Sequence, residues 1–448
     1  MTALKHLLFS ASLVALPVLG FGAAFHRSVR SLTLPARLGA SLALGCVSLT
    51  VTAVLLSTVG IPWSIPALSL PPLVTSSVLW RAWGREARSA TRPLRPSGSV
   101  AVLATAAGGL SVLHLSVALI TAAATSTDFL LFWGVKAVRF AGSRGIDAAL
   151  PKWTYFTHAV PDYPPLVPVV TAWSVLWTGE FSWRLYPVTT ALWALAAAPL
   201  VLELLRRRAT DDQGAAITAF WLAAVSISLA RSLSGGSAEA PLLFFETLAV
   251  AALLAEPDRE SPSRFLPALM LAGAVLTKVE GSVAVLLVAA GALVRDQEAH
   301  GFPTAVRRTV ALVSGAAAAL ATWFLFQATH GLPTGFRGHG DLWSLHRGFL
   351  PEILGGLLRN LDAGTLGLSW LVPLAFLLVS RARIRPLLPA LTLSAGVLAF
   401  LVFDYLHDDR SPSQRIRWTA PSVSQPGLSA LILAAGVATS RKREPAAG

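Results

Sequence analysis

The chain has 448 residues, of which 54% are apolar and only 13% are charged, and its mean hydropathy is +0.63. Soluble proteins carry about 25% charged residues, so this composition excludes an ordinary soluble fold and indicates a polytopic, all-α integral membrane protein. The formal net charge of +13 lies in short basic clusters between apolar runs, a pattern that fixes membrane orientation, and we expect no nucleic-acid partner.

Successive apolar runs of about 17 to 25 residues can each cross a hydrocarbon core of ~30 Å. The first apolar run could also be a cleavable signal peptide. Cleavage would put the next basic cluster outside, against the positive-inside rule, so we favour an uncleaved span. In chain order we expect about thirteen spans, at residues 4–24, 38–59, 66–82, 99–123, 183–204, 215–231, 240–255, 264–277, 281–294, 306–329, 364–380, 386–404 and 420–438.

These spans predict three parts of the chain. Residues 1–98 form an N-terminal extension of about three helices that ends in a basic linker. Residues 99–329 form a seven-helix module with a first outer loop at 124–182, and residues 330–448 hold a variable outer loop and the last helices. Within the first outer loop, Leu166–Trp177 is apolar but short, which favours a re-entrant or interfacial helix.

Basic residues recur in alternate loops, such as Arg206–Arg208, and the positive-inside rule places these loops in the cytoplasm. The interval Ser126–Pro165 then faces the periplasm or the exterior. The many Ala, Leu and Arg beside few Lys are typical of a GC-rich bacterial genome, so we expect a bacterial cytoplasmic membrane, whose lipids are partners. The single cysteine, Cys46, excludes an intramolecular disulfide framework and a cysteine-based metal site.

Charged side chains at membrane depth indicate function by default, and here they gather at the outer ends of the expected spans. The first outer loop begins near Asp128 and continues through an amphipathic stretch with Lys136 and Arg139, three apart on one helical face. Later outer segments are predicted as a loop at His330–Asp362 and a basic loop at Asp404–Trp418.

Three short motifs on this side carry a resemblance to a known family. They are Asp162-Tyr163-Pro164-Pro165-Leu166, Ala238-Glu239-Ala240-Pro241 and Thr277-Lys278-Val279-Glu280-Gly281. In this order the chain resembles the GT-C superfamily of polyprenyl-phosphate-sugar-dependent glycosyltransferases, which includes bacterial protein-mannosyltransferase-like enzymes. The resemblance covers about 350 residues from Val100 onward. The chain departs from this pattern at two positions. Relatives often have Asp where this chain has Glu239, and they have a second acidic residue after the position of Asp128, where this chain has Phe129. These departures put metal-assisted donor binding in doubt.

The resemblance implies an inverting transfer of sugar from a polyprenyl-phosphate donor to a lipid, glycan or protein acceptor. The implied catalytic residues are Asp128, as general base, and Glu239, as its helper; the donor phosphate would contact Lys278 and Arg415. Substrate contacts would come from Lys136, His158, Asp162, Tyr163 and Glu280. No cofactor is required by this chemistry, but His158 and Asp162 could hold a divalent cation, Mg²⁺ or Mn²⁺.

Each of these residues also has a structural reading. Asp128 could cap a helix that starts at Phe129, and Glu239 could pair with Arg231. Lys278 could snorkel to lipid headgroups, which Arg415 could also bind. For the whole chain, the alternatives are a secondary transporter or flippase of a lipid-linked or anionic substrate, and a noncatalytic GT-C relative.

Overall fold

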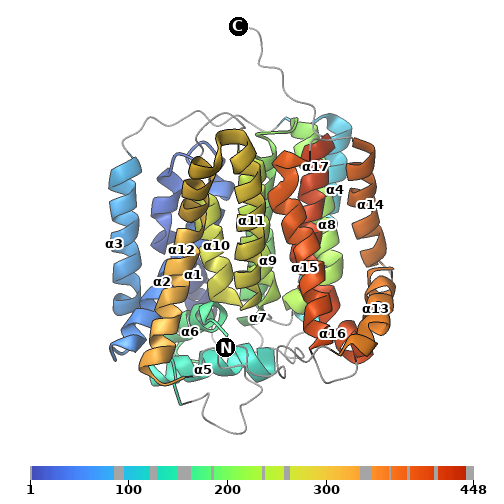
Figure 1. The fold of residues 1–448 in the computed structure, drawn as a ribbon. Helices are drawn as coiled ribbons and strands as arrows, with labels where there is room; N and C mark the ends of the chain where they lie inside the picture. The colour runs from blue at the N-terminus through green and yellow to red at the C-terminus, as the bar shows by residue number, and fades with distance from the viewer. Residues whose placement is uncertain are drawn as a thin grey trace.

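A computed structural model describes residues 3–84, 95–121, 129–149, 163–182, 186–234, 238–256, 263–332, 346–362, 365–380, 384–407 and 412–439. Within these ranges the regular structure is entirely helical, with seventeen α-helices and a few short 3₁₀ or π turns. Most of the helices run side by side, up and down through one bundle (Figure 1).

The described residues of the thirteen apolar runs are largely helical. The corresponding helices are α1 (Ala3–Leu19), α2 (Leu34–Thr58), α3 (Ile65–Trp83), α4 (Gly98–Thr121), α7 (Tyr186–Leu205), α8 (Asp211–Ser234), α9 (Glu239–Leu254), α10 (Phe265–Thr277), α11 (Glu280–His300), α12 (Phe302–Thr329), α14 (Thr365–Ser380), α15 (Leu388–Leu406) and α17 (Gln425–Thr439). Among the residues that the structure describes, three stretches are long and apolar enough to cross a membrane, namely Leu34–Thr58, Phe302–Thr329 and Arg385–Leu406. Several of the others are shorter apolar helices, such as the 13-residue α10.

Four further helices lie between these elements. They are α5 (Gly134–Ser143), α6 (Leu166–Thr178), α13 (Leu350–Asp362) and α16 (Pro412–Val423). The expected loops at 330–362 and 404–418 are therefore partly wrong: α13 begins at Leu350 because its apolar residues recur at helical spacing, burying Ile353 and Leu357 against α16. α6 begins after Pro165 and ends at Gly179, whose positive φ of 73° is a common helix stop. It packs against α1, α2 and α5.

The helix α9 is the centre of the bundle. Every residue from Ala240 to Leu254 is buried, because α9 packs against α7, α10 and α17, with further contacts from α8, α11 and α15. Its approach to α10 depends on Gly273, where an added Cβ would lie 2.1 Å from the ring of Phe245. A helix that is apolar on all sides needs such enclosure, so α9 gives any polar group on it a rigid, water-poor surrounding.

The helices of the first 98 residues belong to the same hydrophobic core. α2 packs against α7, α10 and α12, and α1 packs against α2 and α6. The Trp173 indole of α6 donates a hydrogen bond of 3.0 Å to the Ser12 carbonyl of α1. This part of the chain is thus integrated with the helices that follow it.

The two ends of the bundle differ in their surroundings. At one end, called here the Arg264 end, α9 finishes and α10 begins. Basic side chains make polar contacts there: Arg207 donates to the Ser28 carbonyl at 2.7 Å, and Arg385 pairs with Glu298 at 2.6 Å. At the other, called the Lys278 end, α10 finishes and α11 begins, and α5, α13 and α16 lie across the bundle (Figure 1). The candidate site lies at the Lys278 end.

Candidate functional site

The turn between α10 and α11 presents the candidate site. α10 ends at Thr277, Lys278 has an extended backbone with φ −151° and ψ 162°, and α11 begins at Glu280. The turn is closed by the Gly281 amide, which donates to the Lys278 carbonyl at 3.1 Å. A Cβ on Gly281 would lie 2.1 Å from the Ala274 carbonyl oxygen, so this tight return requires glycine.

Lys278 lies at the centre of a buried ion cluster. Its Nζ is 3.0 Å from Glu239 Oε1 and 2.9 Å from Glu280 Oε1, and the residue is only 7% exposed. Burial opposes the charge on Lys278, but the carboxylates of Glu239 and Glu280 outweigh it and raise the pKa of the ammonium group well above its usual range. The two carboxylates thus favour the charged form of the group, and its burial differs from the snorkelling to lipid headgroups that the sequence left open.

A small closed pocket adjoins this cluster. Its space of about 20 Å³ is lined by Glu239, Glu246, Lys278 and Glu280 on one side. The other wall is apolar and comes from the last helices, with Val397 and Phe400 of α15, Val423 of α16 and Pro426 of α17. A water molecule needs roughly 10–15 Å³, so the pocket has room for about one water and none for a sugar in this closed form.

Two carboxyl groups of this pocket are notable. Glu246, 2% exposed, lies on α9 two turns from Glu239, on the same helical face. At Glu280, Oε2 is buried and has no hydrogen-bond partner among the described residues, although Oε1 binds Lys278. Buried acceptors without a partner are rare and carry a free-energy penalty, so this pocket favours a bound water or a polar ligand atom.

Aromatic rings connect the first outer loop to the cluster. Lys278 Nζ lies 5.7 Å from the centroid of the Tyr163 ring, a cation–π distance. Tyr163 in turn stacks on Trp133, with centroids 5.9 Å apart and planes 14° from parallel. Lys136 Nζ lies 5.4 Å from the Trp133 ring centroid. Side chains from the beginning and the end of the first outer loop therefore meet the α10–α11 turn.

Lys136 and Arg139 differ in their surroundings, despite their spacing of three residues. Lys136 is 4% exposed and faces the bundle, whereas Arg139 pairs with Asp147 at 2.6 Å on a partly exposed surface. The two side chains therefore differ in exposure, and α5, which carries both, packs against α6.

Arg415 belongs to a separate cluster. Its guanidinium group pairs with Asp404 at 2.6 Å and lies 5.4 Å from the Tyr405 ring centroid, where α13, α15 and α16 form a small hydrophobic core of their own. Arg415 is not among the residues that line the Lys278 pocket. Three other candidates, Asp128, His158 and Asp162, lie outside the described residues, as does the side chain of Arg231.

The fit of the described acidic residues to a metal ion is poor. In the part of the chain that the structure describes, no group of three or more His, Cys, Asp or Glu side chains converges as metal ligands. The place that a cation would take between Glu239 and Glu280 is filled by the Lys278 ammonium group. We therefore assign these two glutamates to lysine binding.

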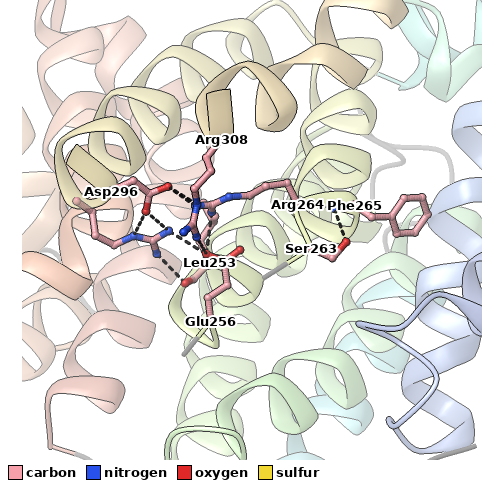
Figure 2. Close-up of polar contacts among 8 residues, drawn as sticks. Leu253, Glu256, Ser263, Arg264, Phe265, Asp296 and Arg308 are labelled. Carbon is pink, nitrogen blue, oxygen red and sulfur yellow. Dashed lines mark hydrogen bonds and ion pairs between the residues drawn. The ribbon is translucent and has the colours of Figure 1, made fainter. Parts of the chain in front are cut away.

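A second buried ion cluster lies at the Arg264 end and was missed by sequence reasoning. Figure 2 shows Arg264 and Arg308 meeting Asp296 and Glu256. The sequence analysis interpreted the basic clusters between apolar runs as orientation signals in cytoplasmic loops, yet Arg264 is 7% and Asp296 2% exposed. The available signal was the presence of both acids and arginines at the ends of neighbouring apolar runs, which permits pairing on folding.

No protein-family model matches the chain, and neither the curated proteins nor the solved structures contain a significant match to it. Any family assignment is therefore a proposal that depends on the residues described above.

Proposed function

We propose that the chain is an integral membrane glycosyltransferase of GT-C type. In this proposal it moves a sugar from a polyprenyl-phosphate donor to a lipid, glycan or protein acceptor at the outer face of a bacterial cytoplasmic membrane. The thirteen apolar helices cross the bilayer, and the Arg264 end, with its basic segments, faces the cytoplasm. The Lys278 end then faces outward.

One observation carries the proposal: three segments that resemble GT-C motifs are far apart in sequence and meet in space. Tyr163 lies against Lys278, and Lys278 binds both Glu239 and Glu280. If the three motifs were only unrelated loops and helix caps, they would have no functional reason to meet at one place. Their meeting point, next to α5 and under the last helices, is where a donor headgroup would enter.

The proposed chemistry is a single displacement. A carboxylate, for which we retain Asp128, accepts the proton of the acceptor hydroxyl, whose oxygen bonds to the anomeric carbon. The bond from that carbon to the phosphate oxygen breaks, and polyprenyl phosphate departs with its electron pair. The Lys278 ammonium group stabilises the negative charge that develops on this phosphate.

This role requires the site to open. Two carboxylates already occupy the Lys278 ammonium group, so a phosphate binds there only when one of them turns away or becomes protonated. The pocket of about 20 Å³ must also widen. We assign gating to the apolar wall with Phe400 and Val423, since none of its residues in the pocket lining is charged.

The test measures transfer of labelled sugar from a polyprenyl-phosphate pool in membranes that contain equal amounts of each variant of the full chain. Asp128→Asn is expected to lose about 10²–10⁴-fold in rate, and Lys278→Gln about 10²–10³-fold. The matched control is Glu298→Gln. This side chain lies at the Arg264 end and is 41% exposed. Equal transfer by wild type and Asp128→Asn would reject that residue as the base.

A second candidate function is favoured by Glu246. This carboxyl lies inside α9 next to a charged helix break, which is an arrangement that secondary transporters use to bind substrate or protons. Under this reading, vesicles that contain the purified chain would move a lipid-linked or anionic substrate, and Glu246→Gln would stop the movement. Absence of both transfer and transport would favour a noncatalytic GT-C relative.

A further inference from the structure

A surface groove runs between α2, α10 and α12, and its volume is about 540 Å³. This volume is within the roughly 300–1,000 Å³ of small-molecule sites. Apart from one arginine and a few hydroxyl groups, its lining is apolar. The walls are formed by Val47 and Val51, by Phe265, Ala268, Leu269 and Ala272, and by Ala311, Ser314, Gly315, Ala318, Ala319 and Thr322.

The groove is hollow because α12 presents small residues along it. Ala311, Gly315 and Ala318 recur at helical spacing and leave the space that larger side chains would fill. Two of its walls, α2 and α12, are among the helices that are long and apolar enough to cross a membrane. A groove of this kind in a membrane faces hydrocarbon chains along its length.

The one charged residue of the lining is Arg264. It precedes α10 and is 7% exposed; its Nη1 donates to Glu256 at 2.8 Å, and its Nη2 to Asp296. Its Nε is buried and has no hydrogen-bond partner among the described residues. Arg264 thus brings a charged side chain to the end of an apolar groove, with its guanidinium group held in place by two carboxylates.

The charge around Arg264 favours an anion. Arg295 binds Glu256 at 2.9 Å and Asp296 at 3.0 Å, and Arg308 reaches Asp296 at 3.1 Å. Among the described residues, three guanidinium groups thus face two carboxylates, which leaves one net positive charge in this set.

We infer that this groove binds an anionic membrane phospholipid, with an acyl chain between α2, α10 and α12 and the headgroup phosphate at Arg264. The site is separate from the proposed donor site. Arg264 and Lys278 lie at opposite ends of α10, whose 13 residues span about 20 Å. The bound lipid belongs to the other leaflet and completes the packing of α12, where 28% of an 18-residue apolar stretch is buried.

The test is native mass spectrometry of the full chain in detergent, titrated with phosphatidylglycerol or phosphatidylcholine of identical acyl chains. Wild type is expected to hold one phosphatidylglycerol about tenfold or more tightly than phosphatidylcholine, a difference of about 1.4 kcal/mol. Ala318→Phe, which fills the groove, is expected to lower retention of both lipids about tenfold or more. The matched control is Ala317→Phe, on the same helix and exposed but outside the groove.

Arg264→Gln is expected to remove the preference for phosphatidylglycerol and to leave phosphatidylcholine retention unchanged. Its control is Arg307→Gln, at an exposed arginine next to the cluster. If Arg264→Gln does not fold, two other measurements test the inference. They are the comparison of Ala318→Phe with Ala317→Phe, and the loss of the wild-type preference for phosphatidylglycerol at high salt. Equal retention by Ala318→Phe and Ala317→Phe, or equal affinity of wild type for the two lipids, would overturn the inference.

Discussion

Replacement of Lys278 by methionine tests whether the Lys278 cluster is a buried ionic unit. The substitution keeps the length of the side chain and removes the charge between Glu239 and Glu280, which lie 3.0 and 2.9 Å from Nζ. Removal of one partner of a buried pair is strongly destabilising, by about 3–5 kcal/mol, because it leaves charge without compensation. Here two carboxylates are left, so we expect a loss at the upper end of this range.

The assay is denaturant unfolding of the full chain in mixed micelles at several pH values. Because the pKa of Lys278 is raised on folding, its stabilising contribution is fully present below its unfolded pKa of about 10.4 and is lost only as pH rises through the higher folded value. Wild type should therefore keep this contribution across pH 5–9.

The control is the triple variant Lys278→Met, Glu239→Gln, Glu280→Gln, which removes the charges together and should recover much of the lost free energy of unfolding. A Lys278→Met loss below about 1 kcal/mol, the value of an exposed ion pair, would refute the reasoning, because it would mean that the three groups are hydrated. The same result would remove the electrostatic basis of the proposed phosphate contact.

Three further predictions concern single positions. Gly281→Ala should lower both the stability of the chain and the rate of sugar transfer, since the added Cβ would lie 2.1 Å from a carbonyl oxygen. The control is Gly142→Ala, which has open space around the added Cβ and should leave both unchanged or raise stability. Tyr163→Phe should keep the cation–π contact to Lys278 and Tyr163→Leu should lose it, at about 0.5–2 kcal/mol. Burial and neighbouring arginines lower the pKa of His26 to about 4. The free energy of unfolding should therefore fall by up to ~3 kcal/mol as pH falls from 6.5 to 4, and it should fall less in His26→Gln.

The positions of the helices were predictable from hydropathy, because each apolar run must form a helix wherever water is excluded. The expected run at 240–255 coincides with α9 (Glu239–Leu254), and that at 386–404 with α15. The amphipathic helix α13 was missed. Its Ile353 and Leu357 are separated by polar and small residues in a segment that composition alone makes a loop.

Which charged residues meet was predictable only in part. Lys278 and Glu280 are two residues apart, so their pairing follows from the turn, but the approach of Glu239 depends on how α9 packs against α10. Arg415 illustrates the opposite case: its partner Asp404 lies two residues before the end of α15, and α16 folds back to meet it. Pairings across helices depend on packing angles that a sequence does not specify.

The last helices have a closer relation to the candidate site than their position in the chain suggests. Val397, Phe400, Val423 and Pro426 form the apolar wall opposite Lys278, while the charged wall comes from α9 and the α10–α11 turn, which the bundle holds rigidly. An apolar wall excludes water and so strengthens every interaction of the ammonium group. Its residues in the pocket lining carry no charge, so none of them is tied to the charged wall by an ion pair. If the proposed transfer occurs, binding of the donor should therefore depend on the motion of α15–α17, and substitutions there should change substrate affinity before they change the chemical step.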